Sequence, residues 1–259
     1  MAAVVAVVGL LGLAIGSFLN VVIWRVPRDE SVVHPGSHCP NCDTEIGARD
    51  NIPVLSWLLL RGKCRHCGNP ISIRYPLVEL GTAGLFVAFA IHFGIHAVLP
   101  AYLYLAAVGV ALAMIDIDLQ RLPDVLTLPS YPIGAGLLAI AAGVDGEWRA
   151  FLRAVIGMAA LWLFYALTSF LYPAGMGWGD VKLSGVLGLY LGWLGWGQLV
   201  VGAFGAFAVG AVVSVGIVVF KDGGRKTKVP FGPFMLIGVL IGIYAGHPIA
   251  QAYTNGFLN

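Results

Sequence analysis

The sequence predicts an all-α polytopic membrane protein with about eight transmembrane helices and one small domain outside the bilayer. Of its 259 residues, 59% are hydrophobic and only 11% are charged, whereas an ordinary soluble domain carries about 25% charged residues. The mean hydropathy is +0.87. The chain therefore lacks the polar groups that would cover a globule in water, which excludes a soluble enzyme.

Eight apolar stretches mark the predicted helices, because a helix that spans a bilayer needs roughly 20 apolar residues. In chain order they are 2–24, 77–98, 100–115, 125–144, 150–171, 183–196, 198–220 and 231–250. The stretch from Lys182 to Trp196 is the shortest, and its fusion with the next would give seven helices and move the C-terminus across the membrane. The first stretch is expected to remain as a helix, because the first basic residues, Arg25 and Arg28, follow the apolar run instead of preceding it.

Basic residues divide unevenly between the two sides of this arrangement. With eight helices, 13 of the 15 Lys and Arg residues fall on one side, including seven in residues 25–75 and four in 221–228. Only Arg149 and Arg153 fall on the other. The positive-inside rule assigns the first side to the cytoplasm and leaves both termini outside. The net charge of +2 is too close to balance to suggest a nucleic-acid partner.

Several glycines recur at four-residue spacing, which would let helix backbones approach closely. The same spacing would also occur by chance in glycine-rich membrane helices. The glycines are Gly12 and Gly16, Gly188 and Gly192, and Gly238, Gly242 and Gly246.

The segment 25–76 is the only stretch long enough to fold outside the membrane, and it holds all four cysteines. They form two C-x-x-C pairs, Cys39 with Cys42 and Cys64 with Cys67, separated by 21 residues, which is close to zinc-ribbon spacing. So short a segment buries little core, so a structural Zn²⁺ would supply much of its folding free energy. A thiol redox pair or unmetallated cysteines are the alternatives, and a disulfide would require the opposite topology. The predicted domains are thus 1–24, 25–76 and 77–259.

Carboxylates at membrane depth are costly and are candidates for function. Five of the 13 acidic residues lie at or inside predicted membrane boundaries: Glu79, Asp116, Asp118, Asp124 and Asp180. Asp116 ends an apolar run, and Asp180 closes the glycine-rich segment 175–180 just before a predicted helix. We expect these glycines to adopt backbone conformations closed to other residues and to frame a water-accessible cleft.

Asp116 and Asp180 share one predicted depth, at cytoplasmic helix ends, and could therefore meet. Two neighbouring carboxylates would share a proton, an arrangement that suits peptide hydrolysis. The alternative is a pair of separate helix-end acids, each bound to backbone amides or paired with Lys182 or Arg121.

Motifs along nearly the whole chain resemble those of the type IV prepilin peptidases, a family of intramembrane aspartic proteases with a G-x-G-D motif. The matching segments, besides the two C-x-x-C pairs, are 16–25, 74–79, 116–124, 177–183 and 230–233. By this resemblance the catalytic residues are Asp116 and Asp180. Asp116 is preferred over Asp118 because the family's first aspartate stands seven residues before the proline that is Pro123 here. Gly177, Gly179, Lys182 and Asp118 would support the catalytic loop.

The resemblance implies that the chain cleaves the basic leader from prepilins or pseudopilins of type IV pili or type II secretion. The cut would occur at the cytoplasmic face of the bacterial inner membrane. It also implies N-methylation of the new N-terminus with S-adenosylmethionine, and Gly62 and Glu79 are the candidates for binding the methyl donor or the amine. Glu79 could equally be a helix-start acid favoured by the helix dipole. The sequence does not indicate an oligomeric state.

A transporter is the competing class of function. Its intramembrane acids would carry protons or cations, and the cysteine domain would form a zinc-stabilised cytoplasmic lid. Transporter sites commonly lie at mid-bilayer on broken helices, whereas the acids here fall at one face.

Overall fold

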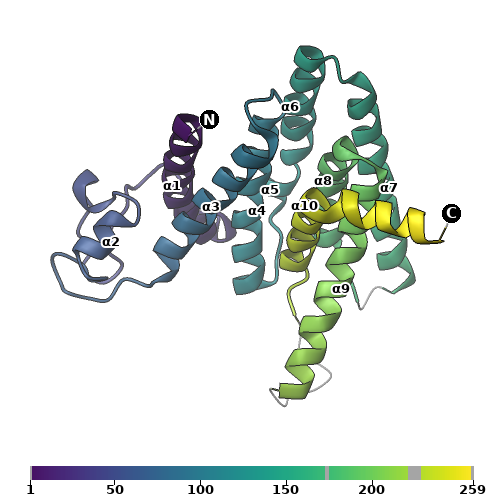
Figure 1. Cartoon of the computed structure of the whole chain (residues 1–259). Coiled ribbons are helices and arrows are strands. Elements are labelled where there is room, and N and C mark those ends of the chain that lie inside the picture. Colours follow the sequence, from purple (N-terminus) through teal and green to yellow (C-terminus); the bar gives the residue numbers. More distant parts are fainter. Residues whose placement is uncertain (1, 173–174, 221–228, 258–259) are drawn as a thin grey trace. The chain divides into compact units, whose positions relative to one another are not determined.

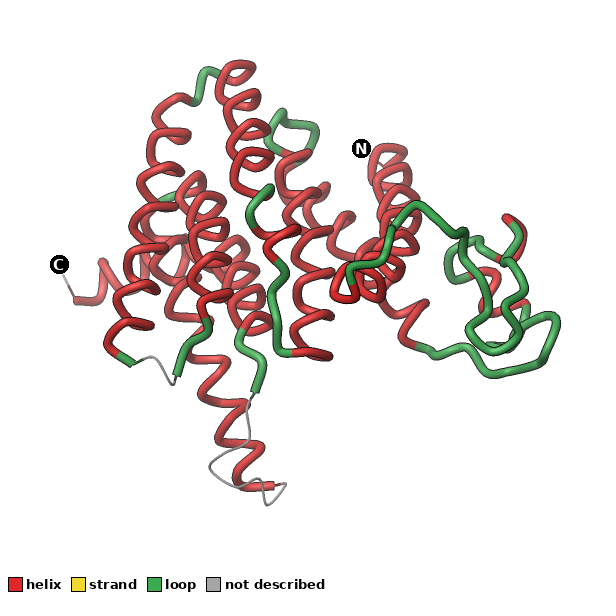
Figure 2. Tube along the Cα trace, turned by 180° about the vertical axis from the view of Figure 1, so that it is seen from behind, coloured by secondary structure: helices red, strands yellow, loops and turns green. Residues whose placement is uncertain are grey.

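The computed structural model describes residues 2–172, 175–220 and 229–257. Over these ranges the protein is helical, with two isolated β-bridges and no strand (Figures 1 and 2). The chain divides into two compact units, Met1–Ala111 and Leu112–Asn259. The four basic residues predicted for a cytoplasmic loop at 221–228 lie outside the described residues.

Unit 1 contains two long helices, α1 (Ala2–Arg25) and α3 (Arg74–Phe93), that pack against each other. Small residues allow the contact: a Cβ added to Gly12 would lie 2.7 Å from the Ala83 Cα, and one added to Gly16 would lie 2.6 Å from the Glu79 Cα. The close approach predicted from the spacing of these two glycines is therefore confirmed. The short elements η1 (Val26–Arg28), η2 (Ala48–Asp50) and α2 (Leu55–Leu59) lie between the two helices in sequence.

Helix α4 (Leu99–Leu119) leads from unit 1 into unit 2, which continues with α5 (Asp124–Thr127), α6 (Ser130–Asp145) and α7 (Trp148–Leu171). It ends with α8 (Trp178–Leu194), α9 (Trp196–Phe220) and α10 (Gly232–Phe257). α8 is the centre of the unit, because α5, α6, α7, α9 and α10 all contact it (Figure 1). Twelve of its 17 residues are buried.

Glycines again set the helix contacts in unit 2. A Cβ on Gly188 of α8 would collide with the Gly157 carbonyl of α7, and a Cβ on Gly192 would lie 2.8 Å from the Arg153 carbonyl oxygen. Between α9 and α10, Gly238 approaches the Gly202 carbonyl in the same way. The remaining predicted positions, Gly242 and Gly246, lie within 2.8 Å of Gln198 atoms by the same measure. The four-residue spacing thus marks real backbone approaches.

An arginine completes the far end of α8. The Arg153 guanidinium of α7 donates from Nε to the Gly192 carbonyl at 2.7 Å and from Nη2 to the Trp193 carbonyl at 2.5 Å. The last carbonyls of a helix have no partner within it, and a cation there also complements the helix dipole. Arg153 therefore caps α8.

Seven helices are long and apolar enough to cross a membrane, among the residues described. The protein is thus a multi-pass membrane protein. The predicted stretch 183–196 corresponds to α8, which is separated from α9 by Gly195. It is therefore a helix of its own and is not fused with its neighbour. With 17 residues and a rise of about 1.5 Å per residue it is about 25 Å long.

Several helix boundaries differ from the prediction: α3 ends at Phe93 instead of 98, α4 at Leu119 instead of 115, and α10 at Phe257 instead of 250. α8 begins at Trp178, five residues before the predicted start, because Gly177 is its N-cap and Asp180 lies in its first turn. The predicted stretch 125–144 is divided into the short α5 and the longer α6, with Pro129 between them as the N-cap of α6. Polar capping residues at helix starts contribute little hydropathy, so the apolar run begins later than the helix.

Candidate active site and metal centre

Asp116 is a buried carboxylate in the last turn of α4, with a side chain and backbone that are only 5% exposed. Its Oδ2 accepts a hydrogen bond of 2.9 Å from the Gly232 backbone N–H, at the first residue of α10. A buried charge needs such compensation. A methyl group on Gly232 would lie 2.8 Å from the same oxygen, so any larger residue there would displace the carboxylate.

Asp180 lies in the first turn of α8 and is partly buried. Its Oδ2 accepts a hydrogen bond of 3.1 Å from the backbone N–H of Gly177, the N-cap residue. This bond is one half of a capping box, and the positive end of the helix dipole favours a negative charge at this position.

The two carboxylates lie near each other at one end of unit 2. Asp116 and Asp180 are close enough for their charges to interact, although 63 residues separate them in sequence. The Leu122 side chain connects their surroundings: a Cβ on Gly179 would lie 3.1 Å from its Cβ, and one on Gly232 would lie 3.4 Å from its Cδ2. That these acids share one membrane depth stays a prediction.

The glycines of the G-x-G-D segment serve a different purpose from the one expected. Gly177 has a φ of −73°, and the glycines with positive φ in the described chain are Gly62, Gly68, Gly94, Gly146 and Gly195. Gly179 is instead small because Leu122 lies against it. The expectation of conformations closed to other residues is therefore wrong here, and close approach is the physical reason for the glycine.

Lys182 is bound to a carboxylate other than the two central ones. Its Nζ lies 2.8 Å from both Oδ1 and Oδ2 of Asp124, and its carbonyl oxygen accepts a hydrogen bond of 2.6 Å from the Tyr131 hydroxyl. The structure therefore contradicts the alternative in which Lys182 pairs with Asp116 or Asp180. Asp118 lies on the exposed side of the last turn of α4.

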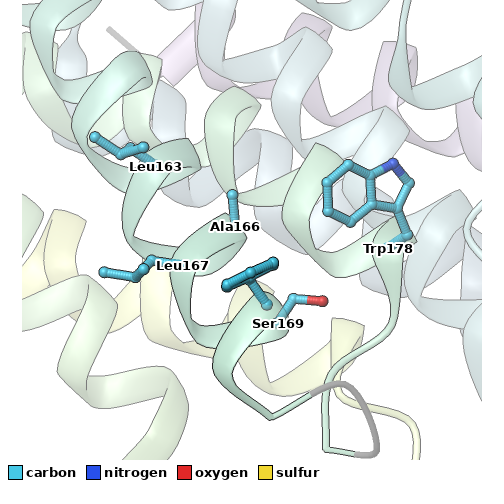
Figure 3. Close-up of a pocket in the computed structure, with 6 residues that line it drawn as sticks. Leu163, Ala166, Leu167, Ser169 and Trp178 are labelled. Atoms are coloured by element: carbon cyan, nitrogen blue, oxygen red, sulfur yellow. The ribbon is translucent and has the colours of Figure 1, made fainter.

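An apolar pocket of about 560 Å³ adjoins the G-x-G-D segment (Figure 3). Residues from the end of α7 form one wall and Trp178, two residues before Asp180, forms another. The lining residues are Leu163, Ala166, Leu167, Ser169, Phe170 and Trp178. The Ser169 hydroxyl donates to the Met176 carbonyl at 3.3 Å, which ties the two walls together.

The four cysteines of unit 1 form a cluster that fits a tetrahedral metal. Their Sγ atoms all lie within 4.8 Å of one another, and those of Cys39 and Cys67 are 3.8 Å apart. Zinc–sulfur bonds of about 2.3 Å in a tetrahedron would separate the sulfurs by about 3.8 Å. The spacing is far longer than a disulfide bond of about 2.05 Å, and all four cysteines are free.

The two C-x-x-C pairs have the same backbone geometry. The first cysteine of each pair donates its N–H to the carbonyl five residues on, at Thr44 and Asn69, and accepts from the N–H four residues on. That fourth residue has a positive φ in both, Asp43 at 52° and Gly68 at 71°. Each pair is therefore a knuckle, a tight turn that points both thiols to one side.

Two of the thiols are prepared to ionise, as metal ligation requires. Hydrogen bonding to the Thr44 side chain lowers the pKa of Cys42 to about 6. Backbone N–H groups of its own knuckle lower the pKa of Cys64. Backbone hydrogen bonds in its knuckle lower the pKa of Cys39, but burial and the neighbouring thiols raise it by more. The pKa of Cys39 therefore rises to about 11. A bound metal ion would offset the cost of ionising Cys39.

Gly62 and Glu79, the residues predicted for the methyl donor or the amine, both occupy structural positions. Gly62 has a φ of +66° and would meet the Trp57 ring at 2.9 Å if it carried a Cβ. Glu79 on α3 is buried, and its Oε2 accepts a hydrogen bond of 2.7 Å from the Val54 backbone N–H. Glu79 therefore attaches the loop before α2 to the membrane helix.

Sequence reasoning missed three contributors to the aspartate site. Gly232 was noticed only as part of the motif 230–233, without a role for its N–H. Leu122 gives no sequence signal, because a single leucine in a loop is common. Tyr165, buried in α7 and near enough to interact electrostatically with Asp180, could have been suspected as a polar group inside an apolar run.

Comparisons with known proteins agree over nearly the whole chain. Residues 10–93 match the bacterial peptidase A24 N-terminal domain, and residues 103–215 match the type IV leader peptidase family. The chain is 39% identical to a prepilin leader peptidase/N-methyltransferase of Aeromonas hydrophila, covering 98% of this chain and 94% of that protein. It is 37% identical to the protein of the same description in Pseudomonas aeruginosa, covering 94% and 91%. No solved structure matches significantly.

Proposed function

Because the chain belongs to the type IV leader peptidase family, we propose that it removes the leader from type IV prepilins or pseudopilins and methylates the new N-terminus. The relatives are described as having both activities. Membership of this family favours the peptidase function over the transporter, which no observation supports.

Asp116 and Asp180 are the proposed catalytic pair. One carboxylate takes a proton from water, and the water oxygen attacks the carbonyl carbon of the scissile peptide bond. The other, protonated, donates a hydrogen bond to the carbonyl oxygen and then supplies a proton as the amine leaves. The observation that carries this proposal is the arrangement at one end of unit 2: Leu122 lies against both Gly179, next to Asp180, and Gly232, which donates to Asp116, so the two carboxylates lie near each other.

Asparagine variants test the pair. Asp116→Asn and Asp180→Asn should each abolish leader removal from a purified prepilin, while the protein remains folded by circular dichroism. Asp118→Asn tests the alternative assignment within the same turn and should retain cleavage. Cleavage that persists in Asp116→Asn but is lost in Asp118→Asn would replace Asp116 by Asp118, and persistence in Asp180→Asn would refute the two-aspartate mechanism.

We propose that residues 25–76 form a zinc domain, between the first helix at 1–24 and the membrane peptidase domain at 77–259. The metal would be held by Cys39, Cys42, Cys64 and Cys67, whose sulfur spacing fits Zn²⁺. Metal analysis of the purified chain should find about one zinc per chain, lost in a Cys39→Ser, Cys42→Ser variant. An unmetallated protein with four titratable thiols would contradict this proposal.

Methylation requires S-adenosylmethionine, which when bound supplies a methyl group on a sulfonium to an uncharged amine. We propose that Gly62 and Glu79 contribute to this second site. Support comes from their location: Gly62 lies in the cysteine domain, and Glu79 contacts the loop of that domain at Val54. Transfer of labelled methyl groups to cleaved pilin should fall in Glu79→Gln with leader removal retained. Unchanged methylation in that variant would restrict Glu79 to its structural contact.

The proposed location is the bacterial inner membrane, with both termini outside and the catalytic pair at the cytoplasmic face. The distribution of basic residues supports this orientation. A prepilin leader is basic and soluble while the mature segment is apolar, so their junction lies at the same face.

A further inference from the structure

Three contacts hold the first turn of α8 against the segment that follows Asp116, and one of them is an ion pair. We infer that Asp124 and Lys182 form a positioning pair, which fixes Asp180 relative to Asp116. This inference rests on the proposed peptidase and concerns the same site.

The ion pair is well formed and joins distant parts of the sequence. The Lys182 Nζ lies 2.8 Å from both carboxylate oxygens of Asp124, and 58 positions separate the residues. The Lys182 side chain is 25% exposed and that of Asp124 is 54% exposed. An ion pair this open to solvent adds little to stability. Its contribution is therefore to the orientation of the residues around it, Asp180 among them.

Asp180 needs an orienting contact from outside its own turn. The hydrogen bond that it accepts comes from Gly177, three residues earlier. That bond fixes the carboxylate to the first turn of α8 but does not fix the turn to α4, where Asp116 lies. Lys182, two residues after Asp180, binds Asp124 at the start of α5, which follows α4 after residues 120–123, and so connects this end of α8 to the segment continuous with α4.

The segment around Asp124 also touches the support of the other carboxylate. Leu122, two residues before Asp124, lies against both Gly179 and Gly232, and Gly232 donates to Asp116. The Tyr131 hydroxyl adds a third connection, to the Lys182 carbonyl. The segment from Leu122 to Tyr131 thus contacts both the start of α8 and the first residue of α10.

The test uses the full chain in detergent with a purified prepilin. Asp124→Asn should lower kcat by between about 10-fold and 100-fold, because a displacement of about 1 Å costs that much in a positioned site. KM should stay within about two-fold, because a pair that only orients Asp180 acts on the chemical step. Asp145→Asn, an exposed acid at the end of α6, is the matched control and should keep the wild-type kcat.

A double-mutant cycle separates positioning from general damage. If the two residues act as one pair, Asp124→Asn with Lys182→Met should lose no more kcat than either single change. Asp124→Glu, which keeps the charge, should recover part of the loss. Where the neutral variants fail to fold, Asp124→Glu and Lys182→Arg are compared instead, and both should lower kcat with KM retained.

A wild-type kcat in Asp124→Asn would overturn the positioning pair. Where the conservative variants are used instead, a wild-type kcat in both of them would overturn it. So would losses of kcat that multiply in the double variant. Failure of the wild-type chain to cleave prepilin would instead contradict the proposed function. The two failures are therefore distinguishable.

Discussion

Backbone N–H groups hold both carboxylates of the proposed catalytic pair. Gly232 donates to Asp116, and Gly177 donates to Asp180. Both donors are glycines, and for Gly232 the reason is direct, since any Cβ would enter the space of the carboxylate. A backbone donor orients a carboxylate without the full charge of a lysine or arginine, so it opposes protonation less strongly. Such an arrangement suits a pair in which one acid must hold a proton.

Gly232→Ala should therefore impair catalysis. The added methyl group would lie 2.8 Å from the Asp116 Oδ2 and 3.3 Å from its Cγ, so the carboxylate must move. We expect kcat for leader removal to fall by about 100-fold, with KM little changed, as measured on a purified prepilin.

Gly136→Ala is the control for that substitution. Gly136 lies in α6, and a Cβ there would have no neighbour within 4 Å. Alanine in a helix is favoured over glycine by about 0.5–1 kcal/mol, so this variant should keep full activity and a slightly higher melting temperature. Equal activity of the two variants would mean that Asp116 tolerates displacement.

At this scale the sequence predicted the acids and the cysteines but not their partners. Asp116 and Asp180 could be selected because carboxylates are costly at membrane depth, and the cysteines because C-x-x-C spacing is specific. The Gly232 N–H could not be predicted, since every residue except proline offers the same backbone donor. The hydrogen bond depends on where α10 begins relative to α4, which no local pattern encodes.

At the scale of elements, α8 is the central helix of unit 2, and hydropathy placed its start five residues too late. It is short, and its start is polar because the capping segment contains Gly177 and Asp180. Long apolar helices such as α1 and α7 were predicted to within a few residues because they follow composition alone. α8 depends on packing: its small residues fit the backbones of its neighbours.

Arg153→Met should destabilise this central helix. It removes two hydrogen bonds to the Gly192 and Trp193 carbonyls and leaves those acceptors unpaired, which should cost about 2 kcal/mol. We expect a lower midpoint of thermal unfolding in detergent. Leader removal at low temperature should be retained, because Arg153 caps the opposite end of α8 from Asp180.

Arg149→Met provides the comparison. Arg149 precedes Arg153 by one helical turn on α7 and is exposed. Its replacement should leave the unfolding midpoint unchanged, and an equal loss of stability in both variants would attribute the effect to charge instead of capping.

For the whole molecule, the basic residues predict which loops share a side of the membrane. The loops at 26–73 and 120–129 should lie in the cytoplasm, and the turn at Gly146 should lie outside. A protease site inserted after Gly68 should be cleaved in inside-out vesicles, whereas one inserted after Gly146 should be protected. The reverse pattern would put the cysteines in an oxidising compartment, where a disulfide framework would be favoured over zinc.

The length of α8 has a consequence for the lipid environment. At about 25 Å this helix is shorter than the hydrocarbon core of a typical bilayer, which is about 30 Å thick, and Asp180 lies in its first turn. Water for hydrolysis must therefore reach below the headgroups, and a thicker bilayer would deepen that path or require local thinning. Leader removal should decline as the enzyme is reconstituted into lipids of increasing acyl-chain length, with binding of prepilin less affected. Membrane composition would then regulate pilus biogenesis without any ligand.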